Sequence, residues 1–231
     1  MMVGEQRDNN ILREDKKTEA ILRIPEAVLA EELLRDEKDS RYLTAEEVKM
    51  IVSSSIEIGK ERAEALRDRP ILERLENAHI KVRYIEPGEE TFSDMNPYAS
   101  VQEAQLLYRP GDVQIKVWMQ PLRFKLKLLS NYMDITEDDL ISLCLCHEYF
   151  HSLEFLEKKR VFDQCGTYTR EFFPGLRRKL RLTSPSEIAA HSFARTYTGF
   201  LYSPEATDLL MLYQEERVKE DRLYDGGVYR V

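Results

Sequence analysis

The sequence has few of the residues that mark fibrous, disulfide-bonded or membrane-spanning chains. Only 9 Gly and 9 Pro occur in 231 residues, which excludes collagen-like and low-complexity structures. Three Cys, an odd number, do not make a disulfide framework, so we expect free thiols in a reducing compartment. No uninterrupted apolar run approaches the roughly 18 residues that a membrane span requires. We therefore expect a soluble protein with no membrane partner.

Basic residues are fewer than acidic residues. The 34 Lys and Arg residues against 42 Asp and Glu residues give a net charge of −8. This balance disfavours direct binding to nucleic acid or to an anionic membrane surface. Charges in residues 1–8 occupy the place where a secretory signal needs an apolar segment, so we expect a cytoplasmic location. The oligomeric state does not follow from these numbers.

The charge content and the hydrophobic pattern of the sequence change near residue 77. Residues 1–76 are highly charged and helical in pattern, and Thr44-x-x-Glu47 is a capping box that opens a helix. We interpret this part as an N-terminal helical extension whose first ~20 residues are loosely ordered, because they offer little to bury. Residues 77–231 combine strands with helices and are expected to form one domain of the α+β class.

Two segments of this domain alternate as half-buried strands do, over 80–85 and 113–119. Pro110 and Gly111 suit a type II turn and predict a hairpin before the second strand. We expect a small twisted mixed sheet packed on a helix over about 136–155. Residues 122–132 fit either a strand or a helix, 161–183 read as a long loop, and 177–181 as a solvated basic helix face.

A His-Glu-x-x-His motif lies inside the predicted helix 136–155, at His147, Glu148 and His151. The i, i+4 spacing puts both imidazoles on one helix face, where they can bind one Zn²⁺. Glu148 can then take a proton from the zinc-bound water as the water attacks a carbonyl. With only four His in the chain, about 0.01 chance matches to this pattern are expected.

A catalytic zinc site usually has three protein ligands and one open position. The extended metzincin pattern needs Gly and His where this sequence has Glu154 and Glu157, so that form is excluded. The other form takes a Glu from a later helix, and Glu187 follows Ser184-Pro185 at such a helix start. Alternatively, Ser184-x-x-Glu187 is a capping box, and Glu187 only bonds the helix start.

The octet over 187–194, Glu-Ile-Ala-Ala-His-Ser-Phe-Ala, resembles the E-x-x-A-N-x-F-A segment of the ImmA/IrrE family of zinc metallopeptidases. That family shares the His-Glu-x-x-His helix, and the match extends loosely over residues 78–204. The resemblance implies a minimal zincin-like, gluzincin-type domain with Zn²⁺ bound by His147, His151 and Glu187. It further implies that Glu148 is the general base and that the activity is regulatory proteolysis, such as cleavage of a repressor.

The sequence departs from the family at His191, where the family has Asn. His191 lies one turn after Glu187 on the same helix face, so it can orient a ligand or replace Glu187 as third ligand. Tyr168, Arg195 and Tyr197 are candidate donors to the oxyanion. The segment Lys116, Val117, Trp118 and Met119 is the candidate edge strand for pairing with an extended substrate.

We therefore expect a zinc-dependent metallopeptidase that acts on a peptide or protein substrate. Two alternatives stay open. The first is that the chain is a catalytically silent regulatory binding module on the same scaffold. The second is that it is a zinc hydrolase of a non-peptide amide, since the same residues allow that chemistry.

Overall fold

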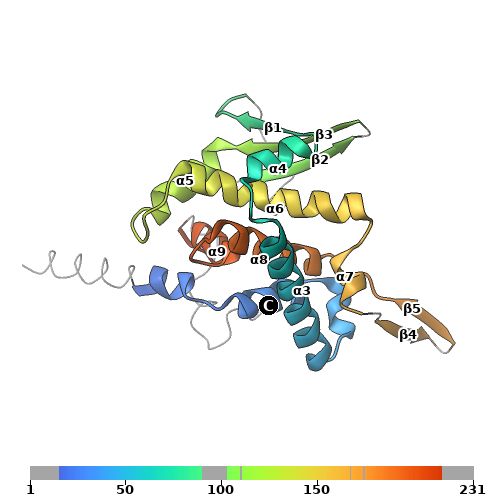
Figure 1. The fold of residues 1–231 in the computed structure, drawn as a ribbon. Coiled ribbons are helices and arrows are strands. Elements are labelled where there is room, and N and C mark those ends of the chain that lie inside the picture. The colour runs from blue at the N-terminus through green and yellow to red at the C-terminus, as the bar shows by residue number, and fades with distance from the viewer. Residues whose placement is uncertain (1–15, 90–102, 110, 167, 174, 215–231) are drawn as a thin grey trace, which may run out of the picture.

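The computed structural model describes residues 16–89, 103–109, 111–166, 168–173 and 175–214. Its elements form layers (Figure 1). A small sheet lies on one side of helix α6 (Glu137–Glu157), helix α8 (Ser184–Thr198) lies on the other side, and helix α3 (Ala45–Leu66) packs beyond α8. The protein is thus of mixed α+β architecture, as predicted.

The main sheet has three strands, β1 (Ile80–Ile85), β2 (Ala104–Arg109) and β3 (Asp112–Trp118), in the order β1-β3-β2. Strands β1 and β3 are parallel, while β2 and β3 are antiparallel, so the predicted mixed sheet is confirmed. The predicted hairpin is confirmed as well, because Arg109 pairs with Asp112 and Gly111 has a φ of +79°, which the turn requires.

The prediction that residues 116–119 form an edge strand is wrong. Lys116, Val117 and Trp118 lie on β3, which pairs with β1 on one side and with β2 on the other. Met119 has already left the sheet and begins helix α5 (Met119–Leu129). In the sheet that the described residues form, β2 is at the edge, and it contacts α6. Alternation alone could not separate β2 from β3, because both are half-buried strands.

The segment predicted as a loop over 161–183 contains regular structure. It forms the short helix α7 (Val161–Gln164) and a projecting hairpin of β4 (Thr169–Phe173) and β5 (Leu176–Lys179), seen in Figure 1. The basic residues from Arg177 are therefore on a strand, not on a helix face. The segment 122–132 fitted either a strand or a helix, and its residues up to Leu129 belong to helix α5.

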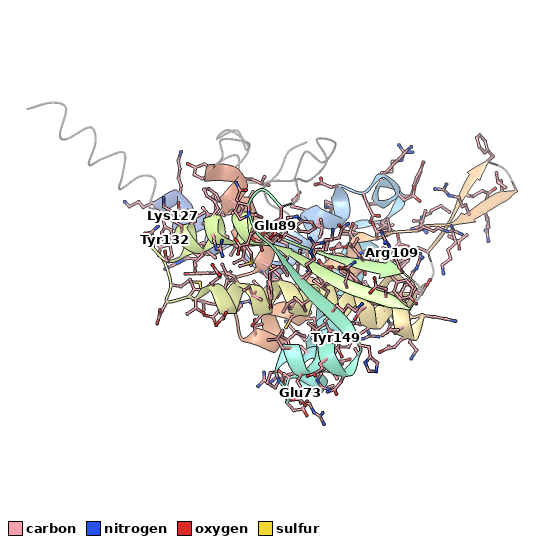
Figure 2. All side chains as sticks on the ribbon, turned by 90° about the horizontal axis from the view of Figure 1, so that it is seen from above. Glu73, Glu89, Arg109, Lys127, Tyr132 and Tyr149 are labelled. Carbon is pink, nitrogen blue, oxygen red and sulfur yellow. The ribbon has the colours of Figure 1, made fainter. Side chains whose placement is uncertain are left out.

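Helix α6 is the central element, and its sequence explains why. Apolar residues occur around its whole circumference, including Leu140, Leu145 and Phe150, each fully buried, which is typical of an interior helix. Thr136 and Asp139 form a capping box at its start, with Thr136 N donating to Asp139 Oδ2 at 2.8 Å. Figure 2 draws the described side chains on the ribbon, seen from above, and labels Tyr149 of α6.

The helices before residue 77 belong to the same hydrophobic core as the rest. They are a helix over 16–22, α2 (Glu26–Arg35), the 3-10 helix η1 (Lys38–Tyr42), α3, and α4 (Ile71–Asn77). Their buried residues, such as Ile51 and Leu75, form one cluster with those of α6 and α8. Residue 76 therefore does not separate two cores. The capping box at Thr44 and Glu47 is confirmed.

The prediction of loose order at the start of the chain is wrong for residues 16–20. They are helical, and Lys17 and Thr18 are buried, because this turn packs beside Ile21 and Leu22 in the common core. Residues 1–15 lie outside the described part of the chain. Within the described part, no helix is both long enough and apolar enough to cross a bilayer.

Helix α8 is fixed by two contacts with the N-terminal helices. Glu37 accepts hydrogen bonds from the backbone N–H groups of Thr183, at 2.7 Å, and Ser184, at 3.0 Å, so a carboxylate caps the start of α8. Farther along, Gly59 of α3 lies so close to α8 that a Cβ there would be 2.3 Å from the carbonyl oxygen of Ala189. Helix α9 (Pro204–Gln214) follows α8.

Replacing Gly59 by Ala should therefore destabilise the protein. Ala normally stabilises a helix interior by about 0.5–1 kcal/mol relative to Gly. Here the clash with Ala189 must force α3 and α8 apart, and overpacking costs about 1–3 kcal/mol. Urea unfolding of Gly59→Ala should show that loss, while Lys60→Ala at the neighbouring exposed position should not. Equal or greater stability of Gly59→Ala would contradict the close approach.

Candidate metal centre

Three predicted ligands converge between α6 and α8. The Nε2 atoms of His147 and His151 are 3.1 Å apart, and Glu187 Oε2 lies 3.3 Å from the first and 3.4 Å from the second. These are the side chains that come together as a potential metal site among the described residues. The Glu187 side chain is 45% exposed, so the group can be reached from solvent.

The donor set and its spacing fit zinc. Two ligand atoms bound at about 2.05 Å to a tetrahedral zinc ion lie about 3.3 Å apart, which matches all three distances between the ligand atoms. Two imidazoles and one carboxylate are also a donor combination of catalytic zinc sites, with a fourth position open. The residues therefore fit the ion that the sequence predicts.

The capping-box alternative for Glu187 is wrong. Thr183 is the N-cap residue of α8, and its own side chain makes no capping hydrogen bond to the helix. The Ser184 hydroxyl instead donates to Glu37 Oε2, at 2.6 Å. Burial raises the pKa of Glu187, but hydrogen bonds from His147 and His151 outweigh burial and hold that pKa well below its usual range. Glu187 faces the two imidazoles as an anion.

Glu154 and Ser186 contact the His151 ring at Nδ1, the nitrogen that does not face Glu187. Nδ1 of His151 lies 3.5 Å from Glu154 Oε2 and 3.4 Å from Ser186 Oγ. Ser186 donates to Glu154, and the Val161 N–H donates to Glu154 Oε1 at 2.8 Å, so this carboxylate is itself fixed. Burial lowers the pKa of His151, but hydrogen bonds with Glu154 and Glu187 outweigh it and raise the pKa to about 10.

His191 is the partner of another carboxylate rather than a member of the three-ligand group. Its Nδ1 lies 2.7 Å from Glu205 Oε1 on α9, and its ring centroid is 4.7 Å from that of His147. Burial lowers the pKa of His191, but Glu205 raises it to about 9. Ser203 donates to Glu205 in turn. His191 thus packs beside His147 and is not one of the three converging side chains.

Strand β2 holds the Glu148 carboxylate. The Leu106 N–H donates to Glu148 Oε2 at 2.7 Å, so one oxygen of the carboxylate is fixed by the edge of the sheet. Glu148 is 9% exposed and lines a cavity together with His147.

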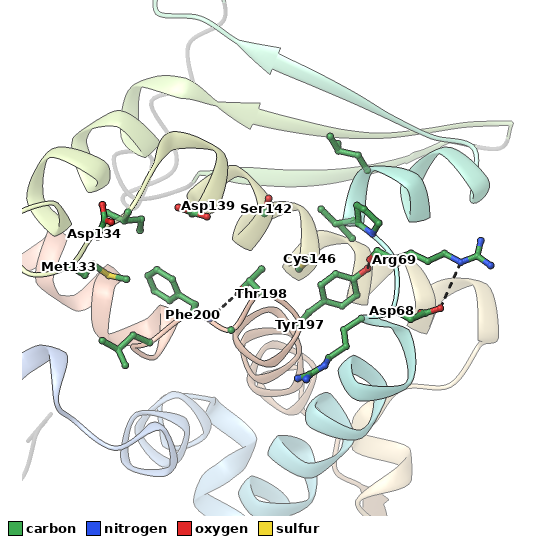
Figure 3. A pocket seen from close by; sticks show the side chains of 17 residues that line it. Asp68, Arg69, Met133, Asp134, Asp139, Ser142, Cys146, Tyr197, Thr198 and Phe200 are labelled. Atoms are coloured by element: carbon green, nitrogen blue, oxygen red, sulfur yellow. Dashed lines mark hydrogen bonds and ion pairs between the residues drawn. The ribbon is translucent and has the colours of Figure 1, made fainter.

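The predicted oxyanion donors are engaged elsewhere. The Tyr168 hydroxyl donates to the carbonyl of Cys165, and Arg195 donates to Glu26 and to the carbonyl of Leu201. Tyr197 donates to the carbonyl of Arg69 and lines a cavity of about 670 Å³ that opens on another face of α6 (Figure 3). Neither cavity beside the three ligands is lined by any of these three residues.

Several contacts at the centre were not predicted from the sequence. Glu154 follows His151 by three residues on one helix face, and this spacing is a signal that could have found it. The other missed groups meet the centre only through tertiary folding, and no local pattern marks them; they are Ser186, Glu205, and the Leu106 N–H.

Comparisons with protein-family models, with curated proteins and with solved structures find no match to this chain. The chemistry of the centre therefore has to be judged from its own residues.

Replacing Glu154 by Gln should weaken zinc binding about 10- to 100-fold, because the carboxylate orients His151 without binding the ion. Glu187→Gln, which removes a charged ligand, should weaken binding further. Glu157→Gln is the matched control, since Glu157 lies on the same helix and pairs with Arg62 instead. Competition titration with a chromophoric zinc chelator measures all three. Equal affinity of wild type and Glu187→Gln would contradict the assigned ligand.

Proposed function

We propose that this chain is a zinc-dependent metallopeptidase with a zincin-like architecture. The observation that carries the proposal is the spacing of 3.1–3.4 Å among His147 Nε2, His151 Nε2 and Glu187 Oε2, beside the carboxylate of Glu148. When bound, zinc supplies a Lewis acid that polarises a substrate carbonyl and makes water easier to deprotonate.

The chain's own residues provide the proton transfers. Glu148, fixed through Oε2 by the Leu106 N–H, accepts the proton of the attacking water through Oε1. The same carboxyl group then donates the proton to the amine nitrogen that leaves. Glu154 and His191 keep the two imidazoles in place, so the acceptor is presented at one position relative to the ligands.

An extended peptide is the favoured substrate because β2, an edge strand, passes directly over Glu148. Backbone groups of such an edge can pair with a substrate strand. The similarity of residues 187–194 to the ImmA/IrrE segment supports regulatory proteolysis of a cytoplasmic protein, such as a repressor. A binding module would not need a carboxylate held at the position of Glu148.

Glu148→Gln should keep zinc and lose activity. The substitution preserves shape but removes the proton acceptor, so cleavage of a denatured protein pool should fall about 10²- to 10⁴-fold. Metal analysis of the same preparation should still give one zinc per chain, and Glu157→Gln should cleave like wild type.

Three results would contradict the proposal. If zinc-loaded Glu148→Gln cleaves protein as fast as wild type, Glu148 is not the general base. If zinc-loaded wild type hydrolyses small amides but no protein, the chain is an amide hydrolase; if it hydrolyses neither, it is a binding module.

A further inference from the structure

Two cavities of different size flank the three ligands. The smaller, of about 120 Å³, is lined by His147 and Glu148, and the larger, of about 540 Å³, is lined by His151 and Glu187. Among the described residues, none lines both cavities. A peptide that crosses the centre would therefore place side chains in a different cavity on each side of the bond to be broken.

Strand β2 runs from the smaller cavity toward the larger one. Ala104, its first residue, lines the smaller cavity. Tyr108, near its other end, has its ring centroid 3.8 Å from that of Phe155, which lines the larger cavity. An extended peptide paired with this edge would thus span both cavities.

The position of Glu148 sets the direction of that peptide. The leaving amine belongs to the C-terminal product, and Glu148 must reach its nitrogen to protonate it. Because Glu148 lines the smaller cavity, the residue on the C-terminal side of the broken bond belongs there. The peptide then runs antiparallel to β2, a pairing that a short edge strand readily forms.

The smaller cavity is narrow and polar. Its volume corresponds to about four water molecules. Lys125 lies at its wall, 2% exposed, with Nζ 2.6 Å from both Glu103 Oε1 and Asp208 Oδ1. An ammonium has three N–H donors, and among the described residues two carboxylates lie against it. Together with Glu148, three carboxyl groups and one ammonium line this cavity, a balance that disfavours an acidic side chain.

The larger cavity is lined by apolar side chains and by groups of both charges, among them Glu154 and Glu187. Its apolar lining includes Phe155, which is 50% exposed, and the buried Val161 and Phe162. Lys158 and Arg160, both exposed, also line it. A volume of 540 Å³ is enough for a large apolar side chain and its neighbour.

We propose that the chain selects extended peptides with a small polar residue, such as Ser, Thr or Asn, directly C-terminal to the broken bond. A large apolar residue on the N-terminal side occupies the cavity of Phe155. This inference rests on the proposed peptidase function. Small hydroxyl and amide side chains have about two to four non-hydrogen atoms and can both donate and accept near Lys125 and Asp208.

The test is a series of peptides that differ only at the residue after the intended cleavage site. Zinc-loaded wild type should cleave the Ser and Asn peptides at least about tenfold faster, in kcat/KM, than the Phe and Glu peptides. Binding of the same peptides to zinc-loaded Glu148→Gln, followed by fluorescence anisotropy, gives a second readout without turnover.

One substitution in each cavity, paired with a control variant beside it, tests whether that cavity is the source of the peptide preference. Ala104→Leu fills the smaller cavity and should cut kcat/KM for the Ser peptide about tenfold or more, whereas Gln105→Leu, on the opposite face of β2, should not. In a second pair of peptides, with Leu or Ser before the bond, Phe155→Ala should reduce the preference for Leu, whereas Leu156→Ala, of similar exposure, should not.

Cleavage of the four peptides at equal rates would overturn the inference and leave the peptidase function standing. If no peptide is cleaved, the peptidase function is wrong, and binding to Glu148→Gln then decides on the cavities. Equal binding of all four peptides would overturn the inference, and tighter binding of the Ser and Asn peptides would support it.

Discussion

Helix α8 has to lie against helix α6 at one register, because Glu187 meets both imidazoles from a single position on α8. The distances of 3.3 and 3.4 Å from its Oε2 to the two Nε2 atoms leave little room for sliding. Glu37 fixes the start of α8, and the close contact at Gly59 fixes its middle. The N-terminal helices thus set the geometry of a centre to which they contribute no ligand.

The same packing explains how the three side chains stay open to solvent. Helix α6 is buried among apolar neighbours, and its two imidazoles lie on one stripe that faces Glu187 of α8. The sheet covers the other side of α6 and leaves its edge strand, β2, over Glu148. A buried scaffold and an exposed strand edge meet at the ligands, which suits catalysis on an extended chain.

Local patterns predicted the parts of this protein that depend on local physics. The His147 and His151 stripe follows from helix periodicity, the caps at Thr44 and Thr136 from side-chain chemistry, and the hairpin from Gly111. The order of the strands did not follow, because the parallel pairing of β1 with β3 joins segments that are distant in sequence. Tyr197 was misassigned for the same reason, since its partner, the Arg69 carbonyl, is brought close only by folding.

A crystal structure of the zinc-loaded protein, with anomalous diffraction recorded at the zinc edge, tests the central claim most directly. We expect one anomalous peak per chain, within bonding distance of Nε2 of His147, Nε2 of His151 and the carboxylate of Glu187. A peak bound by His191 in place of Glu187, or no peak between α6 and α8 in a zinc-saturated crystal, would contradict it.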